Sequence, residues 1–202
     1  MNLDVLRSVL TDAQRIGLLG PQPVDQHINH ARSWADGLEP APFLDLGSGA
    51  GVPGLVFAVL WPDVPATLLD GQIRRTAWLR TAAARLGIDH RIRVAEGRAE
   101  ELAIRPELRE QFPLVVARGF GPPASAAECG SGFLRLQGLL SISEPPSPEP
   151  DRWPKDGLAR IGLETHSQVV HPDGSFVILR KFEPLDANLP RQRNLPLRKP
   201  LW

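Results

Sequence analysis

Three closely spaced glycines form the part of this sequence best suited to holding a cofactor. Gly47, Gly49 and Gly51 follow a short apolar run, at the point where a strand should turn into a helix. Glycine tolerates positive φ and lets a ligand lie against the backbone. The helix that follows offers N–H groups without helical partners and a positive dipole end. Asp45, just before the glycines, could reach an amino group of such a ligand directly or through water.

Two more segments follow at spacings that nucleotide-binding folds use. Asp70 ends the next short apolar run, about twenty residues after the glycine loop, and its carboxylate can accept hydrogen bonds from both hydroxyls of a ribose. Ala99 and Glu100 follow the third predicted strand, where an adenine would lie. Together with the glycine loop, these residues predict a site for a ligand that contains adenosine.

Three interpretations of the glycine loop are open. Gly49 to Gly54 satisfies the pattern G-x-G-x-x-G of dinucleotide sites, where the helix end would hold a pyrophosphate. In a methyltransferase the same helix end faces the methionine part of S-adenosylmethionine. The loop could also be a purely structural turn. Asp45 stands where dinucleotide folds usually need an apolar residue, and Pro53 removes an N–H from the anion-binding turn. Both features favour the methyltransferase interpretation.

The elements around these residues predict an α/β, doubly wound sheet. Amphipathic helices are expected first, over 3–19 and 24–38. Apolar runs then alternate with helical segments: strands are expected at 41–46, 66–69, 91–95, 114–117 and 138–142, and helices at 52–61, 74–86 and 123–134. Strands at 164–170 and 175–181 are joined by Asp173-Gly174, a strong hairpin signal. A mostly parallel sheet that ends in an antiparallel hairpin is the Rossmann-like outline of class I methyltransferases.

Several segments carry a resemblance to one family. They are Phe43–Gly54 (FLDLGSGAGVPG), Thr67–Asp70 (TLLD), Arg98–Glu100 (RAE), Val116–Phe120 (VARGF) and Pro190–Leu201. They resemble the RsmG (GidB) family of 16S ribosomal RNA guanine-N7 methyltransferases, of which this chain looks like a divergent member with a short N-terminal part. The V-P-G after the glycines and the A-R-G-F are more specific than the glycines themselves. We therefore expect a helical N-terminal segment at 1–40, a methyltransferase domain at 41–183 and a basic, proline-rich C-terminal tail at 184–202.

The resemblance implies that the cofactor is S-adenosylmethionine and that Arg118 lies beside both the cofactor and the target base. It also implies cofactor contacts at Gly47, Val52, Ala99, Glu100 and Arg118. Together with the residues inferred above, the predicted cofactor-binding set is Asp45, Gly47, Gly49, Gly51, Val52, Asp70, Ala99, Glu100 and Arg118. Guanine N7 has a free lone pair, so methyl transfer to it needs no general base, and catalysis would consist mainly of alignment and charge stabilisation. Arg118 is accordingly the one residue to which we assign a catalytic role.

The implied partner is 16S ribosomal RNA in the small ribosomal subunit. Lys and Arg balance Asp and Glu at 23 each, so RNA binding needs a local basic patch. The tail offers one, and its predicted RNA-binding residues are Arg191, Arg193, Arg198 and Lys199. The alternative for the tail is a segment that packs its leucines on the domain. His27 and His30 are expected to make core or capping hydrogen bonds, with no metal site.

One departure from the family pattern leaves the acceptor open. Glu144-Pro145 stands where the family has lysine and glycine, so an acid replaces a cation near the RNA. A methyltransferase for a small molecule or another acceptor, and a non-catalytic RNA-binding or assembly protein with a vestigial pocket, therefore remain alternatives. We expect a cytoplasmic monomer: the only cysteine is Cys129, and no signal peptide or membrane-spanning run is present.

Overall fold

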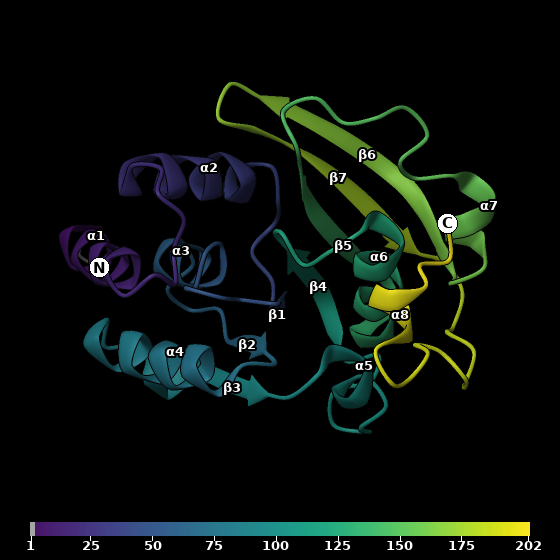
Figure 1. Cartoon of the computed structure of the whole chain (residues 1–202), viewed down its shortest axis with the longest axis horizontal. Coiled ribbons are helices and arrows are strands. Elements are labelled where there is room, and N and C mark those ends of the chain that lie inside the picture. Colours follow the sequence, from purple (N-terminus) through teal and green to yellow (C-terminus); the bar gives the residue numbers. More distant parts are fainter. Residues whose placement is uncertain (1–2) are drawn as a thin grey trace.

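The strands form one seven-stranded sheet in the order β3-β2-β1-β4-β5-β7-β6. In this computed structural model, which describes residues 3–202 (Figure 1), the strands are β1 (Phe43–Leu46), β2 (Ala66–Asp70), β3 (Ile92–Glu96), β4 (Phe112–Ala117), β5 (Leu134–Glu144), β6 (Leu163–His171) and β7 (Gly174–Lys181). Strands β1 to β5 pair in parallel, and β7 runs antiparallel to both β5 and β6. The predicted class I outline, with its final hairpin, is confirmed.

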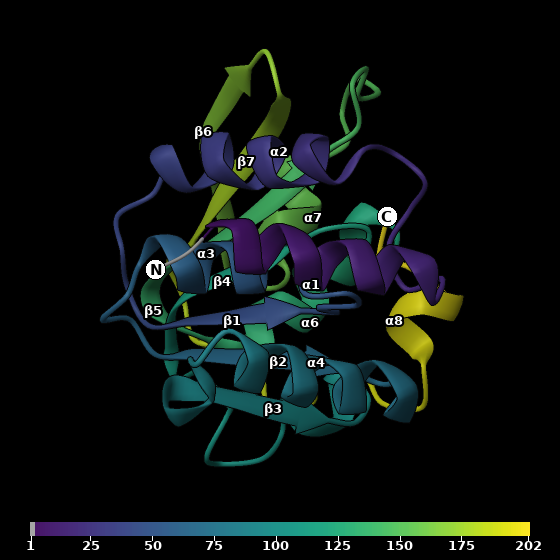
Figure 2. The same cartoon turned by 90° about the vertical axis from the view of Figure 1, so that its left-hand side faces the viewer.

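Helices cover both faces of the sheet. In Figure 1 one group lies on the side of the N-terminus and the other on the side of the C-terminus, and in Figure 2 the first group faces the viewer. The first group is α1 (Leu3–Arg15), α2 (Val24–Asp36), α3 (Gly54–Leu60) and α4 (Ile73–Arg85); the second is α5 (Ala99–Leu102), α6 (Pro123–Phe133), α7 (Lys155–Ala159) and α8 (Leu195–Arg198). A short 3-10 helix, η1 (Asp89–Arg91), leads into β3. The C-terminal segment thus lies against the domain, beside α5 and α6.

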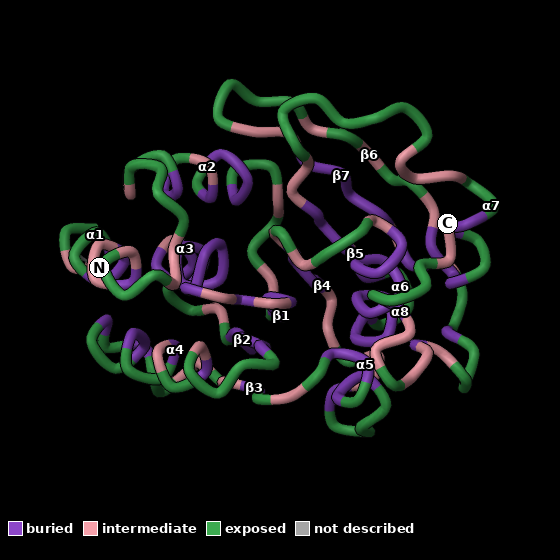
Figure 3. Tube along the Cα trace, in the orientation of Figure 1, coloured by how far each residue is buried: buried purple, intermediate pink, exposed green. Residues whose placement is uncertain are grey.

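Each central strand supplies both hydrophobic cores. Phe43 packs in the core under α1 to α4, and its neighbour Leu44 packs in the core under α5 to α7. Leu114 and Val115 divide in the same way on β4. Side chains alternate between the faces of a strand, so a strand covered on both faces is mostly apolar. Figure 3 shows this buried centre, with exposed residues on the outer helix faces and at the β6–β7 hairpin.

Several predicted boundaries were wrong, for local reasons. The first helix ends at Arg15, before Gly17, whose φ is +74°. Strand β5 begins at Leu134 rather than at 138, because a bulge at Gln137, with φ of 62°, interrupts its alternation. Helix α3 begins at Gly54, so the glycine loop is longer than expected. Within residues 3–202, no helix is long and apolar enough to cross a membrane.

Candidate active site

The glycine loop lies between the end of β1 and the start of α3, and its backbone requires glycine. Gly47, Gly49 and Gly51 all have positive φ, at 73°, 56° and 100°. A Cβ added to Gly51 would lie 2.3 Å from the side chain of Leu55, and one added to Gly47 would lie 2.8 Å from the ring of Phe120. The loop therefore combines left-handed backbone with close approach by its neighbours, as predicted from the sequence.

Asp45 is a buried carboxyl group with one oxygen left open. It is 1% exposed. Its Oδ2 accepts a hydrogen bond of 3.0 Å from the N–H of Gly54, at the start of α3, and its Oδ1 has no partner. Burial raises the pKa of Asp45 to about 7. A buried acceptor of this kind is suited to a cationic group of a ligand, such as an ammonium.

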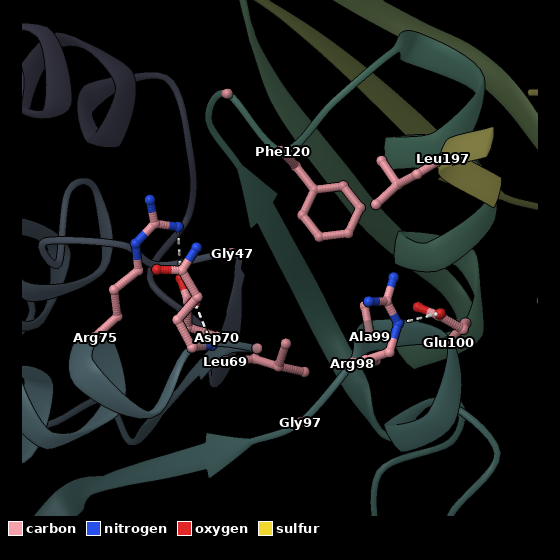
Figure 4. Close-up of a pocket in the computed structure, with 13 residues that line it drawn as sticks. Gly47, Leu69, Asp70, Arg75, Gly97, Arg98, Ala99, Glu100, Phe120 and Leu197 are labelled. Carbon is pink, nitrogen blue, oxygen red and sulfur yellow. Dashed lines mark hydrogen bonds and ion pairs between the residues drawn. The ribbon is translucent and has the colours of Figure 1, made fainter. Parts of the chain in front are cut away.

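A hollow of about 340 Å³ opens at the ends of β1, β2 and β3 (Figure 4). Asp70 lines it and also fixes the loop, because its Oδ2 accepts from the N–H of Gly49 and its Oδ1 from the N–H of Gln72, both at 2.9 Å. Arg75 lies 3.5 Å from the same carboxylate. Each carboxylate oxygen can accept more than one hydrogen bond, so Asp70 can bind both the loop and a ribose.

The predicted adenine contact holds the C-terminal tail as well. Ala99 and Glu100 line the hollow, opposite Asp70 in Figure 4. The Glu100 carboxylate is nearly buried and accepts hydrogen bonds from Arg98 Nε at 2.7 Å and from the N–H of Asn194 at 2.8 Å. Burial opposes its charge, but these hydrogen bonds outweigh burial and lower the pKa of Glu100. A ligand would therefore meet Glu100 with its carboxylate already bound to the tail.

Arg118 follows β4 and lies beside the hollow rather than in it. Its Nη2 lies 3.1 Å from Nδ1 of His27 on α2, and its Nη1 is buried without a partner. His30 also makes hydrogen bonds, to the carbonyl of Asp173 and to Ser143 Oγ. Both histidines thus make the hydrogen bonds predicted for them. Among the described residues, no cluster of His, Cys, Asp or Glu could hold a metal ion.

Asp45 and Arg118 do not line the hollow, but each has chemistry that suits one end of an amino-acid group such as that of the predicted cofactor. Each keeps one buried polar atom without a hydrogen-bond partner, Oδ1 of the carboxylate and Nη1 of the guanidinium. The two groups are close enough for the positive charge on Arg118 to lower the pKa of Asp45 against the effect of burial. An ammonium would satisfy the first atom and a carboxylate the second. Val52, the last residue of the predicted cofactor set, is buried between the glycines and α3.

Phe120 and Leu197 are among the residues that line the hollow without having been predicted as cofactor contacts. The Phe120 ring projects into it, and Leu197 of α8 points into the same space (Figure 4). Phe120 had a signal in the sequence, because it lies three residues after the end of β4, and ligands bind at strand ends in α/β sheets. Leu197 had none, since its position depends on where the tail docks. Its side chain would lie 2.6 Å from a Cβ added to Gly121.

The cations of the tail fall into two groups. Arg191 is directed inward: its guanidinium binds Glu128, whose side chain is 0% exposed, with Nη2 at 2.7 Å from Oε2. It also donates to the carbonyl of Lys199. Its predicted role in RNA binding does not agree with this placement, because the buried carboxylate requires the cation. The side chains of Arg193, Arg198 and Lys199 have no partner among the described residues and remain available.

Comparison with known proteins gives matches over most of the chain. A family model described as rRNA small subunit methyltransferase G (GidB) matches residues 9–143. Ribosomal RNA small subunit methyltransferase G of Moorella thermoacetica is 31% identical over 171 residues, which cover 80% of this chain and 70% of the relative. The protein of the same name from Lactobacillus delbrueckii subsp. bulgaricus is 32% identical over 170 residues, which cover 81% and 71%.

The solved structures that match are similar in fold. A crystal structure of a candidate O-methyltransferase from Klebsiella pneumoniae superposes with a TM-score of 0.61. The alignment covers 89% of this chain and 90% of that chain, at 17% sequence identity. At this identity the likeness concerns the arrangement of strands and helices, and it agrees with the strand order found here.

Proposed function

Because the chain belongs to the family of ribosomal RNA small subunit methyltransferase G, it is an S-adenosylmethionine-dependent methyltransferase, and we propose that it methylates N7 of a guanine in 16S ribosomal RNA. The observation that carries this proposal is the position of Arg118 and Phe120. Phe120 lines the cofactor hollow and also a second hollow beside it, which Arg118 lines as well. An acceptor base in the second hollow would lie next to the cofactor.

The residues that hold the cofactor are, in this proposal, those predicted from the sequence. Asp45 and Arg118 bind its amino-acid end, Gly47, Gly49, Gly51 and Val52 form the loop against it, Asp70 binds the ribose, and Ala99 and Glu100 border the adenine. When bound, S-adenosylmethionine supplies a methyl group on a positively charged sulfur. The protein's own part is to orient the base and to exclude water. A nitrogen with a free lone pair requires no proton transfer to a side chain.

Arg118 orients the acceptor in this scheme. A guanidinium donates well to the O6 edge of guanine, which lies next to N7. His27 already binds Nη2 of Arg118, and the buried Nη1 has two N–H groups, so one can donate to the carboxylate of the cofactor and the other to the base. Because His27 of α2 holds the guanidinium on one side, its N–H donors have a fixed direction. The Arg118 side chain therefore loses little conformational entropy when the base binds.

The acceptor is presented, in our view, by the small ribosomal subunit in the cytoplasm, and the enzyme acts as a monomer. The unpaired tail cations Arg193, Arg198 and Lys199 support RNA contact, because phosphate binding needs cations that are not neutralised within the protein. They lie on the tail that also borders the cofactor hollow through Leu197.

Transfer of labelled methyl to small subunits that lack this methyl group tests the proposal. We expect incorporation at a single guanine of 16S ribosomal RNA, and chain cleavage specific for 7-methylguanosine should map it. The same assay with subunits that already carry the methyl group is the control and should show no incorporation. Protein that binds S-adenosylmethionine but transfers no methyl group to the subunits would overturn the proposed acceptor, and would favour a small-molecule one.

A further inference from the structure

The second hollow lies at the ends of β4 and β5 and encloses about 440 Å³. Gly119 and Phe120 line both this hollow and the cofactor hollow, so the two are neighbours. The near wall carries Arg118 and Phe120. The far wall comes from the segment after β5 and carries Arg152 and Trp153. An aromatic ring and a guanidinium therefore line each side.

Glu144, the last residue of β5, holds this far wall in place. Its Oε2 accepts a hydrogen bond of 2.7 Å from Nε of Arg152, and its Oε1 accepts one of 2.9 Å from Nε1 of Trp153. The Glu144 side chain is 7% exposed. A nearly buried carboxylate with both oxygens in charge-assisted or indole hydrogen bonds fixes its partners strongly.

The segment that Glu144 fixes has few other anchors. Residues 145–151 between β5 and Arg152 are all exposed. One further hydrogen bond comes from Trp202, whose Nε1 donates to the carbonyl of Arg152 at 3.1 Å. Trp153 also packs against the core under α5 to α7. Because the preceding residues are exposed, the polar contacts of Glu144 and Trp202 are what fix the direction of the Arg152 side chain and of the Trp153 indole N–H.

We propose that Glu144 is a positioning residue, and that it fixes Trp153 and Arg152 as the wall that receives the acceptor guanine. This inference rests on the proposed function. A base taken out of an RNA strand is bound by stacking on aromatic side chains and by hydrogen bonds to its edges. Phe120 and Trp153 supply the rings. Nη1 of Arg118 has a second N–H beside the one proposed for the carboxylate of the cofactor, and Arg152 keeps both terminal NH₂ groups, since only its Nε has a partner among the described residues.

This arrangement changes the meaning of the acid at position 144. The sequence predicted that Glu144 replaces a cation on the acceptor side by an acid. In the structure Glu144 forms an ion pair with Arg152. The guanidinium is the member of the pair nearer to solvent, because the Arg152 side chain is 24% exposed and that of Glu144 is 7% exposed. The donors needed for a guanine edge or an adjacent phosphate are therefore present.

Kinetics of methyl transfer to unmethylated small subunits test this role. The variants are Glu144→Ala, Trp153→Ala and Trp153→Phe. Glu164→Ala is the matched control, because Glu164 binds Arg180 on the outer strands and does not line the hollow. For each variant we would measure KM for the subunit, kcat, the Kd of S-adenosylhomocysteine by calorimetry, and the melting temperature.

We expect Glu144→Ala and Trp153→Ala to raise KM for the subunit about ten-fold or more, which is the size of one lost base stack. The Kd of S-adenosylhomocysteine should stay at its wild-type value, and Trp153→Phe, which keeps a flat ring, should recover most of the loss. A KM for Glu144→Ala equal to that of the control, with wild-type protein active, would overturn this inference alone. A parallel rise in the Kd of S-adenosylhomocysteine would also overturn it. Inactive wild-type protein would overturn the proposed function and this inference together.

Discussion

Arg118 and His27 form a hydrogen bond of 3.1 Å between Nη2 and Nδ1 that joins the end of β4 to helix α2. The other ring nitrogen, Nε2, lies 3.4 Å from the carbonyl oxygen of Gly20. A carbonyl can only accept, so Nε2 carries the proton and Nδ1 accepts from the guanidinium. Burial lowers the pKa of His27, and the charge of Arg118 lowers it further. The ring therefore stays neutral and holds Arg118 at the second hollow, where we propose that the acceptor binds.

Replacing His27 should impair catalysis without unfolding the protein. We expect His27→Ala to lower kcat/KM for the small subunit about ten-fold, because a hydrogen bond to a charged group contributes roughly 1.5–3 kcal/mol. His27→Gln, which keeps an acceptor, should lose less. His90→Ala, at an exposed histidine of η1, is the control. If His27→Ala transfers methyl groups at the control's rate, Arg118 does not need this anchor.

Asp45 should destabilise the free protein and bind the cofactor. Its pKa is raised from 3.8 to about 7, so ionisation is less favourable in the folded protein than in the unfolded chain. The free energy of unfolding therefore falls as the pH rises from about 4 to 7. Asp45→Asn, which can still accept from the Gly54 N–H, should raise the melting temperature at pH 8. The gain, on the order of 1–3 kcal/mol, should shrink at pH 5, where the wild-type carboxyl group is already protonated.

The same substitution should weaken cofactor binding at pH 8, about ten-fold or more, because a charge-assisted hydrogen bond to the ammonium is lost. In the wild-type protein, affinity for S-adenosylmethionine should fall as the pH drops below about 7. Calorimetry across this range measures both effects. If the wild-type protein and Asp45→Asn are equally stable at both pH 8 and pH 5, ionisation of Asp45 does not destabilise the fold. That result would contradict this explanation of the site.

Asp70 should be needed for cofactor binding in two ways. Its carboxylate is proposed to bind the ribose, and it also holds the N–H groups of Gly49 and Gln72. We expect Asp70→Ala to weaken binding of S-adenosylhomocysteine about a hundred-fold, since two or more such hydrogen bonds are lost. Glu96→Gln is the control, at the end of the neighbouring strand, where the carboxylate binds Thr76 and Arg80 instead. Unchanged affinity in Asp70→Ala would contradict the ribose assignment.

How much of this site the sequence could predict depends on the distance along the chain between interacting residues. The glycine loop, Asp45 and Asp70 belong to one strand–loop–helix unit and its neighbour, so local spacing predicted them. Glu100 was predicted as a cofactor contact, but its hydrogen bond to the N–H of Asn194 joins residues 94 positions apart. Burial of Lys181, which is 0% exposed, likewise depends on distant Glu110. No local pattern indicates such pairs.

The inward group of tail cations should act on stability and on the cofactor hollow. Arg191 is the ion-pair partner of buried Glu128, and removing one partner of a buried pair costs about 3–5 kcal/mol. We expect Arg191→Met to lower the melting temperature and to weaken cofactor binding, because Leu197 and the contact to Glu100 depend on the docked tail. Denaturant unfolding and calorimetry measure the two effects. A wild-type melting temperature would mean that the tail docks without this pair.

The outward group should act on RNA binding alone. Arg193 and Lys199 have no side-chain partner in the described part of the chain, so substitution leaves no buried charge behind. We expect Arg193→Gln and Lys199→Gln each to weaken binding to the small subunit and to reduce the slope of log K against log salt by about one. Melting temperature and affinity for S-adenosylhomocysteine should stay at wild-type values, in contrast to Arg191→Met. Arg160→Gln, at an exposed arginine that follows α7, controls for net charge. If all three substitutions change the salt slope equally, the tail has no special place on the RNA, and the attraction comes from the surface as a whole.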